Sequence, residues 1–282
     1  MKISKSKKGS ELLTFGGHLE VLRRMLFRVC GLAACVALFV FCFKEETFKL
    51  LLAPSEWDFV TYRWIERVIR YCGGGFHFEE FHVDLIATEL SSQFMTHVTT
   101  AIYLGLLGAS PYIVYELFRF VSPALYENEK KNVKWVFLLG TIMFFIGCAV
   151  GYFMVFPMTL RFLATYQLSA NITEQVSLDS YMDNFLMLIF VMGIVFEMPL
   201  VSWLLSKIGL LKRSFFHKYR RHAIVGLLVA AAFITPSSDP FTLGIVFFPL
   251  YGLFELSAFF VKNDTNGDAD DEDEDSTEIA PA

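Results

Sequence analysis

Three groups of acidic side chains have the type and spacing to do chemistry. The first is Glu197, which stands inside an otherwise apolar stretch, residues 184–206. An ionised carboxylate in such a stretch is costly unless it is paired, hydrated or protonated, so an embedded acid is functional more often than not. Two interpretations remain open: a functional polar site, or a protonated glutamate that hydrogen-bonds a neighbouring helix.

The second group is Glu127 and Glu129, which follow Ser122 and Pro123. Serine followed by proline is a helix-start signal, so we expect a short interfacial helix from Ser122 onward. The two carboxylates would then face the cytoplasm. From spacing alone, a solvated face beside the lysines that follow is the favoured interpretation.

The third group is Glu20, which reaches Arg23 and Arg24 at the i+3 and i+4 positions of a predicted amphipathic helix. Taken alone, this arrangement is an ordinary start of an interfacial helix.

A weaker set of possible zinc ligands surrounds three consecutive glycines. Its members are Cys72, His77, Glu79, Glu80 and His82. Their spacing matches no defined zinc site. We therefore interpret the set as an exposed polar loop and predict no metal.

These residues must be positioned by helices in a membrane. The chain has 282 residues, of which 55% are hydrophobic, and a mean hydropathy of +0.49. A soluble core cannot bury this much apolar surface. We predict an all-α integral membrane protein whose helices form a concave cup.

A crossing needs about 20 apolar residues. Six segments are predicted to cross: 25–43, 94–115, 135–158, 184–206, 223–235 and 241–261. The fifth segment is short, roughly 20 Å by helical rise. We expect it to form an antiparallel pair with the sixth in a locally thinned bilayer.

The loop charges predict the orientation, because Lys and Arg stay in the cytoplasm. Six basic residues precede residue 25, four lie between the second and third spans, and six lie in 207–221. We therefore predict that both termini are cytoplasmic in an inner-membrane protein. Residues 1–24 would form a cytoplasmic arm, 25–262 the membrane domain, and the acidic residues 263–282 a disordered tail.

Motifs for a catalytic nucleophile, for phosphate binding and for an HExxH pair are absent from the sequence. The chain is thus predicted not to be an enzyme. A proton-coupled secondary transporter of a small solute that uses Glu197 stays open as an alternative, as does a scaffold that contacts no substrate.

The segments together resemble TatC, the polytopic subunit of the twin-arginine protein translocase, from about residue 18 to 262. The resemblance rests on ordered motifs that each lie at the expected depth. They are His18 to Arg23, Ala53-Pro54, Phe118 to Lys131, Val155-Phe156-Pro157, Phe196-Glu197-Met198-Pro199, Thr235-Pro236 with Asp239, and Pro249 to Glu255.

The resemblance implies binding of twin-arginine signal peptides of folded precursors and export driven by the proton-motive force. It implies TatA/TatB-type single-span partners, several copies of the chain in a larger complex, no cofactor and no nucleic acid. Glu129 matches the family's signal-binding carboxylate, Glu20 and Phe118 match further site positions, and Glu127 lies beside them. The remaining motif positions are Arg23, Pro54, Pro123, Tyr126, Pro199 and Asp239.

Two residues depart from the family pattern. Val21 stands where the family has a second acid that contributes to signal recognition, and Met25 replaces a second basic residue. Whether Glu20 substitutes for the missing acid is left open. The segment 56–83 is also longer than is usual in the family.

Overall fold

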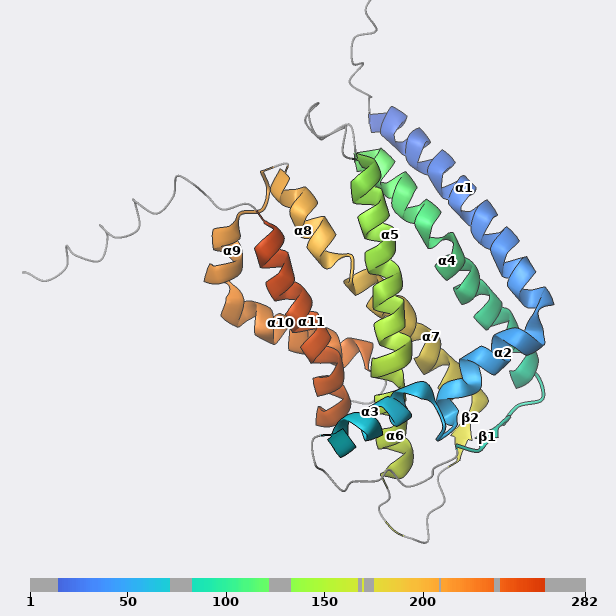
Figure 1. Cartoon of the computed structure of the whole chain (residues 1–282). Helices are drawn as coiled ribbons and strands as arrows, with labels where there is room; N and C mark the ends of the chain where they lie inside the picture. Colours follow the sequence, from blue (N-terminus) through green and yellow to red (C-terminus); the bar gives the residue numbers. More distant parts are fainter. Residues whose placement is uncertain are drawn as a thin grey trace, which may run out of the picture.

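The computed structural model describes residues 15–71, 83–121, 133–166, 169, 175–207, 209–235 and 239–261 (Figure 1). The chain is built from helices of very different length. The long helices are α1 (Phe15–Cys42), α4 (Ser92–Val121), α5 (Val133–Val150), α7 (Leu178–Val195) and α11 (Pro240–Phe260). The shorter helices are α2 (Lys44–Leu52), α3 (Val60–Tyr71), α6 (Phe156–Thr165), α8 (Met198–Lys207), α9 (Arg213–Lys218) and α10 (Arg220–Ile234).

Five helical segments in the described part of the chain are long and apolar enough to cross a membrane. They are Glu20–Cys42, Ser92–Leu117, Phe137–Thr165, Leu178–Lys207 and Pro240–Phe260. The third joins α5 to α6 through a π-helical turn, Gly151–Val155, and the fourth joins α7 to α8. The prediction of an all-α membrane protein is therefore confirmed.

The short fifth segment of the sequence prediction falls on α10, which has 15 residues. At 1.5 Å per residue it is about 22 Å long, which is less than the hydrocarbon core of a typical bilayer. A count of six crossings, with both termini on one side, stays a prediction.

Figure 1 shows that the two ends of the helix bundle differ. The start of α1, the end of α4, the start of α5 and the ends of α8 and α11 lie at the upper end. The lower end carries α2 and α3, which run across the long helices. It also carries a short parallel pair of strands, β1 (Leu85–Ile86) and β2 (Val176–Ser177).

The span formed by α7 and α8 is the centre of the fold, and α1 is at its edge. Within the most apolar window of each span, 56% of residues are buried for Leu178–Lys207 and 11% for Glu20–Cys42. Phe185, Leu188 and Met192 of α7 are fully buried in the main apolar cluster. The outer helix α1 is therefore held mainly by its neighbour α4.

Close helix packing depends on glycines at two contacts. A Cβ atom on Gly105 of α4 would lie 2.7 Å from the carbonyl oxygen of Ala33 in α1. A Cβ atom on Gly147 of α5 would lie 2.5 Å from the carbonyl oxygen of Met192 in α7. Small residues let helix backbones approach closely, which is how helices associate where lipid gives no hydrophobic driving force.

Candidate functional site

The upper end of α1 presents a carboxylate that already binds two guanidinium groups. Glu20 accepts hydrogen bonds from Nη2 of Arg23 at 3.0 Å and from Nε of Arg24 at 2.9 Å. These residues, with Phe27 and Arg28, line an open depression of about 600 Å³. The predicted i+3 and i+4 contacts thus form, and they hold Glu20 within a surplus of positive charge.

A second carboxylate lies next to this depression, on α4. Glu116 is 3% exposed, and its Oε1 lies 3.0 Å from Nη1 of Arg28 on α1. The same oxygen accepts a hydrogen bond from the Tyr112 hydroxyl at 2.7 Å and lies 4.0 Å from Nη1 of Arg119. This network joins the upper parts of α1 and α4 by a charged contact.

Most of the other signal-peptide site residues predicted from the sequence lie outside the described residues. Pro123, Tyr126, Glu127 and Glu129 fall in 122–132, outside the described residues. Phe118 belongs to α4, but its side chain is not described. The segment 122–132 connects the end of α4 to the start of α5, and both of these lie at the upper end with α1 (Figure 1).

Glu197 lies where the fourth long segment is interrupted. Helix α7 ends at Val195, and α8 begins at Met198 and carries Pro199 in its first turn. Proline cannot donate a backbone hydrogen bond, which explains a break at this position. The Oε1 atom of Glu197 is buried without a hydrogen-bond partner among the described residues.

A neighbouring helix leaves room for this carboxylate. Oε2 of Glu197 lies 3.3 Å from the position that a Cβ atom would take on Gly140 of α5. A larger residue at position 140 would therefore press on the Glu197 side chain and on Leu200, whose Cδ2 lies 2.7 Å from the same point.

Three other motif positions have structural contacts. Pro54 is buried in a short 3₁₀ turn, Ala53–Ser55, and its carbonyl oxygen accepts a hydrogen bond from the Tyr62 hydroxyl at 3.2 Å. Pro199 is buried at the start of α8. Asp239 caps α11, because its Oδ1 accepts a hydrogen bond from the Thr242 backbone N–H at 2.8 Å.

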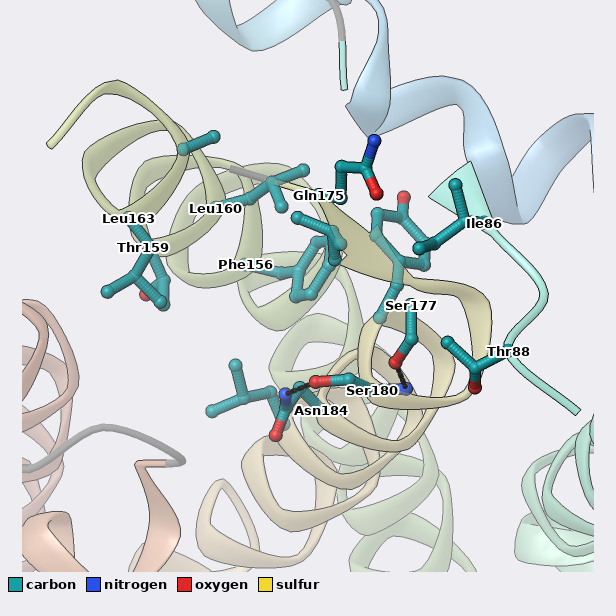
Figure 2. Close-up of a pocket in the computed structure, with 14 residues that line it drawn as sticks. Ile86, Thr88, Phe156, Thr159, Leu160, Leu163, Gln175, Ser177, Ser180 and Asn184 are labelled. Atoms are coloured by element: carbon teal, nitrogen blue, oxygen red, sulfur yellow. Dashed lines mark hydrogen bonds between the residues drawn. The ribbon is translucent and has the colours of Figure 1, made fainter. Parts of the chain in front are cut away.

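A separate cavity of about 330 Å³ lies at the lower end, between α6, α7 and the two short strands (Figure 2). Figure 2 shows hydroxyl and amide side chains beside an apolar wall, with Asn184 donating to the Ser180 hydroxyl at 3.4 Å. No charged side chain is among the fourteen described residues that line it. It therefore does not offer the carboxylates that a guanidinium needs.

The possible zinc ligands Cys72, His77, Glu79, Glu80 and His82 lie outside the described residues.

The ion pair between half-exposed Arg28 and buried Glu116 was not predicted from the sequence. The second predicted span, 94–115, ends just before Glu116. The available signal was one acid and one arginine at similar depths in adjacent spans, a combination that predicts pairing because isolated charges in lipid are costly.

The fold and its polar sites define the class of the molecule: a multi-span α-helical membrane protein with acidic side chains at one end and within one span. The family model for "Sec-independent protein translocase protein (TatC)" matches residues 17–249. The chain therefore belongs to the TatC family.

Curated relatives from distant sources agree with this assignment. A TatC protein of Blattabacterium is 30% identical over 251 residues, covering 88% of this chain and 94% of the relative. A TatC protein of Deinococcus radiodurans is 30% identical, covering 85% of this chain and 82% of the relative. A chloroplastic TATC of Pisum sativum is 31% identical, covering 87% of this chain and 63% of the relative.

Solved structures agree as well. A crystal structure of the twin-arginine translocase receptor TatC matches with a TM-score of 0.68 at 28% identity and covers 86% of this chain and 97% of its own. A second crystal structure of the TatC receptor, in DDM, gives a TM-score of 0.70 at 28% identity, with coverages of 87% and 99%. The chain is thus a non-enzymatic, multi-pass component of the twin-arginine translocase, and the comparisons do not support the alternative of a small-solute transporter.

Proposed function

We propose that this chain is the signal-peptide-binding core of the translocase, with Glu129 and Glu20 binding the paired arginines of a precursor. The observation that carries the proposal is that α4 packs against both α1 and α5, and that the start of α1, the end of α4 and the start of α5 all lie at the upper end (Figure 1). Glu20 lies on α1 at this end, and the segment that contains Glu129 connects the other two helices there.

The chemistry of Glu20 supports a role with guanidinium ligands. Its carboxylate accepts hydrogen bonds from Arg23 and Arg24 of its own helix, and those two side chains are 65% and 73% exposed. Exposed pairs contribute little stability and exchange readily. An incoming arginine can therefore replace one of these partners at little cost.

We assign the larger share of the binding of the signal peptide to Glu129, because the charges around Glu20 are mainly positive. The depression around Glu20 contains one carboxylate and the guanidinium groups of Arg23, Arg24 and Arg28. A cationic peptide would be repelled by this surplus unless more acids approach it. Glu129, with Glu127 beside it, supplies carboxylates that accept hydrogen bonds from the guanidinium groups of the peptide, although Lys130 and Lys131 follow them directly.

We further propose that the upper end faces the cytoplasm, with both termini on that side of the cytoplasmic membrane. The basic residues of α1 and the end of α4 support this orientation, because Lys and Arg are retained on the cytoplasmic side.

The direct test is crosslinking of a precursor that carries a photoreactive group beside its Arg-Arg pair. Glu129→Gln removes the charge and nearly preserves the shape, so we expect a lower yield than with the wild type. The loss corresponds to about 2 to 5 kcal/mol if the pair is desolvated and to less than about 1 kcal/mol if it is exposed. Equal yields would remove Glu129 from the site.

Two controls separate recognition from general damage. Glu56→Gln changes a carboxylate near the lower end and should leave the yield unchanged. A precursor with Lys-Lys in place of Arg-Arg should crosslink poorly to the wild type. Its crosslinking yield should fall little further with Glu129→Gln. A chain that never crosslinks to any signal peptide would support the scaffold alternative.

We propose that Glu197 binds a polar group in the membrane helix of a TatA/TatB-type single-span partner. Its unpartnered Oε1 and the break before Pro199 support this role, because a buried unpaired acceptor is stabilised when a donor arrives.

Co-purification of a TatA-type subunit and export of a folded reporter test this role. Glu197→Ala should reduce both, and Glu197→Gln should retain part of each because the amide still hydrogen-bonds. Ile194→Ala, which changes an exposed apolar side chain in the same span, is the control. If Glu197→Ala behaves as this control does, the carboxyl serves only in packing.

A further inference from the structure

Helix α3 has three different faces. Successive residues turn by about 100° around a helix. On this basis four apolar side chains form one exposed stripe: Val60, Trp64, Val68 and Tyr71, which are 62%, 61%, 41% and 94% exposed. A second face is packed against the protein, and a third carries the charged residues. A helix with such a pattern is typical of segments that lie in a membrane interface.

The packed face fixes α3 across the lower end of the third span. The Tyr62 hydroxyl donates to the carbonyl oxygens of Pro54 at 3.2 Å and Pro157 at 3.0 Å, and Thr61 donates through Oγ1 to the carbonyl of Phe153. Burial raises the pKa of the Tyr62 phenol above its ordinary value, so the hydroxyl remains a donor. The exposed stripe is thus held in one orientation.

The start of α3 lies beside the exposed surface of a membrane span. The ring of Phe59 stacks on that of Phe153, with centroids 6.0 Å apart and planes at 12°. Phe153 and Met154 belong to the span Phe137–Thr165 and are 46% and 52% exposed. An apolar side chain exposed on a membrane span faces lipid, so the contact of Phe59 with Phe153 places the start of α3 close to lipid.

Two of the three arginines on the charged face of α3 pair with local acids. Nη2 of Arg63 lies 2.8 Å from Oδ2 of Asp58, and Nη2 of Arg70 lies 2.9 Å from Oε1 of Glu66. Tryptophan and tyrosine favour the boundary between lipid and water, where one part of the ring is apolar and another is polar. The stripe therefore suits the interface whether or not the lipid headgroups are anionic.

We propose that α3 is an interfacial anchor whose Val60, Trp64, Val68 and Tyr71 enter the phospholipid leaflet at the lower end. Figure 1 shows α3 running across the long helices, as an anchor in the plane of a leaflet must. The anchor fixes the depth of the segment that follows the first span. This inference is independent of the signal-peptide site.

The test uses full-length protein in phosphatidylcholine nanodiscs whose lipids are brominated near the top of the acyl chain. Bromine quenches tryptophan fluorescence on contact. The difference between the wild type and Trp64→Phe isolates Trp64, while the other tryptophans stay in place. The control is the double variant Trp64→Phe with Arg63→Trp, which moves the tryptophan to the charged face. We expect bromolipid to quench Trp64 roughly twice as strongly as it quenches the tryptophan at position 63.

Lipid composition and a soluble quencher complete the test. Exchange of part of the phosphatidylcholine for phosphatidylglycerol should leave the Trp64 signal unchanged, because Arg63 and Arg70 are paired and the apolar stripe itself carries no charge. Quenching of Trp64 by iodide and not by bromolipid would place the stripe in water and overturn the proposal. Protection of Trp64 from both quenchers would also overturn it, since protein, such as a second copy, would then cover the stripe.

Discussion

At the scale of single residues, Glu116 has the surroundings of a buried ion pair. It is almost fully buried beside Arg28, while Arg28 itself remains 47% exposed in its side chain. A carboxylate at such a depth needs several donors, and Tyr112 and Arg28 supply them. Among the described residues, Glu20, in contrast, pairs with exposed arginines of its own helix alone. The contact of Glu116 with Arg28 therefore suits a role in stability, and the contact of Glu20 with Arg23 and Arg24 suits exchange of one arginine for another.

We predict that Arg28→Met lowers the free energy of unfolding by about 1 to 2 kcal/mol, because the buried Glu116 would lose its guanidinium partner on α1 and keep a weaker set of donors. The estimate is below the value for a fully buried pair because Arg28 is half-exposed. Unfolding in mixed micelles, followed by tryptophan fluorescence, measures the change.

The control and the double variant make this prediction specific. Arg24→Met removes only an exposed contact and should leave stability nearly unchanged. Combining Arg28→Met with Glu116→Gln should cost less than the sum of the two single changes, since coupled residues are not additive. Additive losses would show that the two side chains stabilise the fold separately.

At the scale of elements, the contact of α5 with α7 depends on the absence of a side chain. The backbone of Met192 lies so close to Gly147 that a Cβ atom would meet a carbonyl oxygen, which cannot rotate away. The helices must separate to admit even one methyl group, so the central span would lose contacts along its length.

We predict that Gly147→Ala destabilises the protein by about 1 to 3 kcal/mol through overpacking. The matched control is Gly252→Ala in α11, where nothing lies within 4 Å of the added Cβ. That change should be neutral or should stabilise by up to about 1 kcal/mol, because alanine favours the helix. The same unfolding measurement applies, and equal effects at both positions would contradict the packing argument.

Another element, the span of α7 and α8, combines rigidity with a break. The lower part is held by Asp179, which accepts hydrogen bonds from the hydroxyls of Ser92 and, at 2.6 Å, Thr96 of α4. The upper part begins anew at Met198, after Glu197. Because Asp179 fixes α7 and the helix is interrupted before α8, the carboxyl of Glu197 has a defined position within the span.

At the scale of the whole molecule, the two ends of the bundle have different chemistry. The upper end carries Glu20 with its two arginine partners and the contact of Arg28 with Glu116, whereas the lower end carries crossing helices, an uncharged cavity and the aromatic stripe of α3 (Figure 1). An asymmetric protein of this kind has a defined orientation in the membrane.

We predict that Cys72 reacts with a membrane-impermeant maleimide in intact cells, because the lower end faces outward in the proposed orientation. The experiment uses a Cys42→Ser background, since Cys42 is exposed at the lower end of α1. Labelling should disappear with Cys72→Ser. A Ser4→Cys variant that lacks Cys72 should react only after the cells are permeabilised, and its labelling in intact cells would reverse the assigned topology.

The sequence by itself determined that this is an all-α membrane protein of the TatC family. These properties follow from local information: apolar runs long enough for lipid, and motifs whose residues are close together in the chain. The i+3 and i+4 pairing of Glu20 was predicted for the same reason, because helix geometry alone sets that spacing.

Only the tertiary structure decided which distant residues meet. The pairing of Arg28 with Glu116, the binding of Ser92 and Thr96 by Asp179, and the attachment of Tyr62 to Pro54 and Pro157 all depend on how the helices pack. The amphipathic pattern of α3 is local, but which apolar side chains of that helix stay exposed was set by that attachment. Helix spacing fixes neighbours within about one turn, whereas contacts between helices depend on close packing that no local pattern encodes.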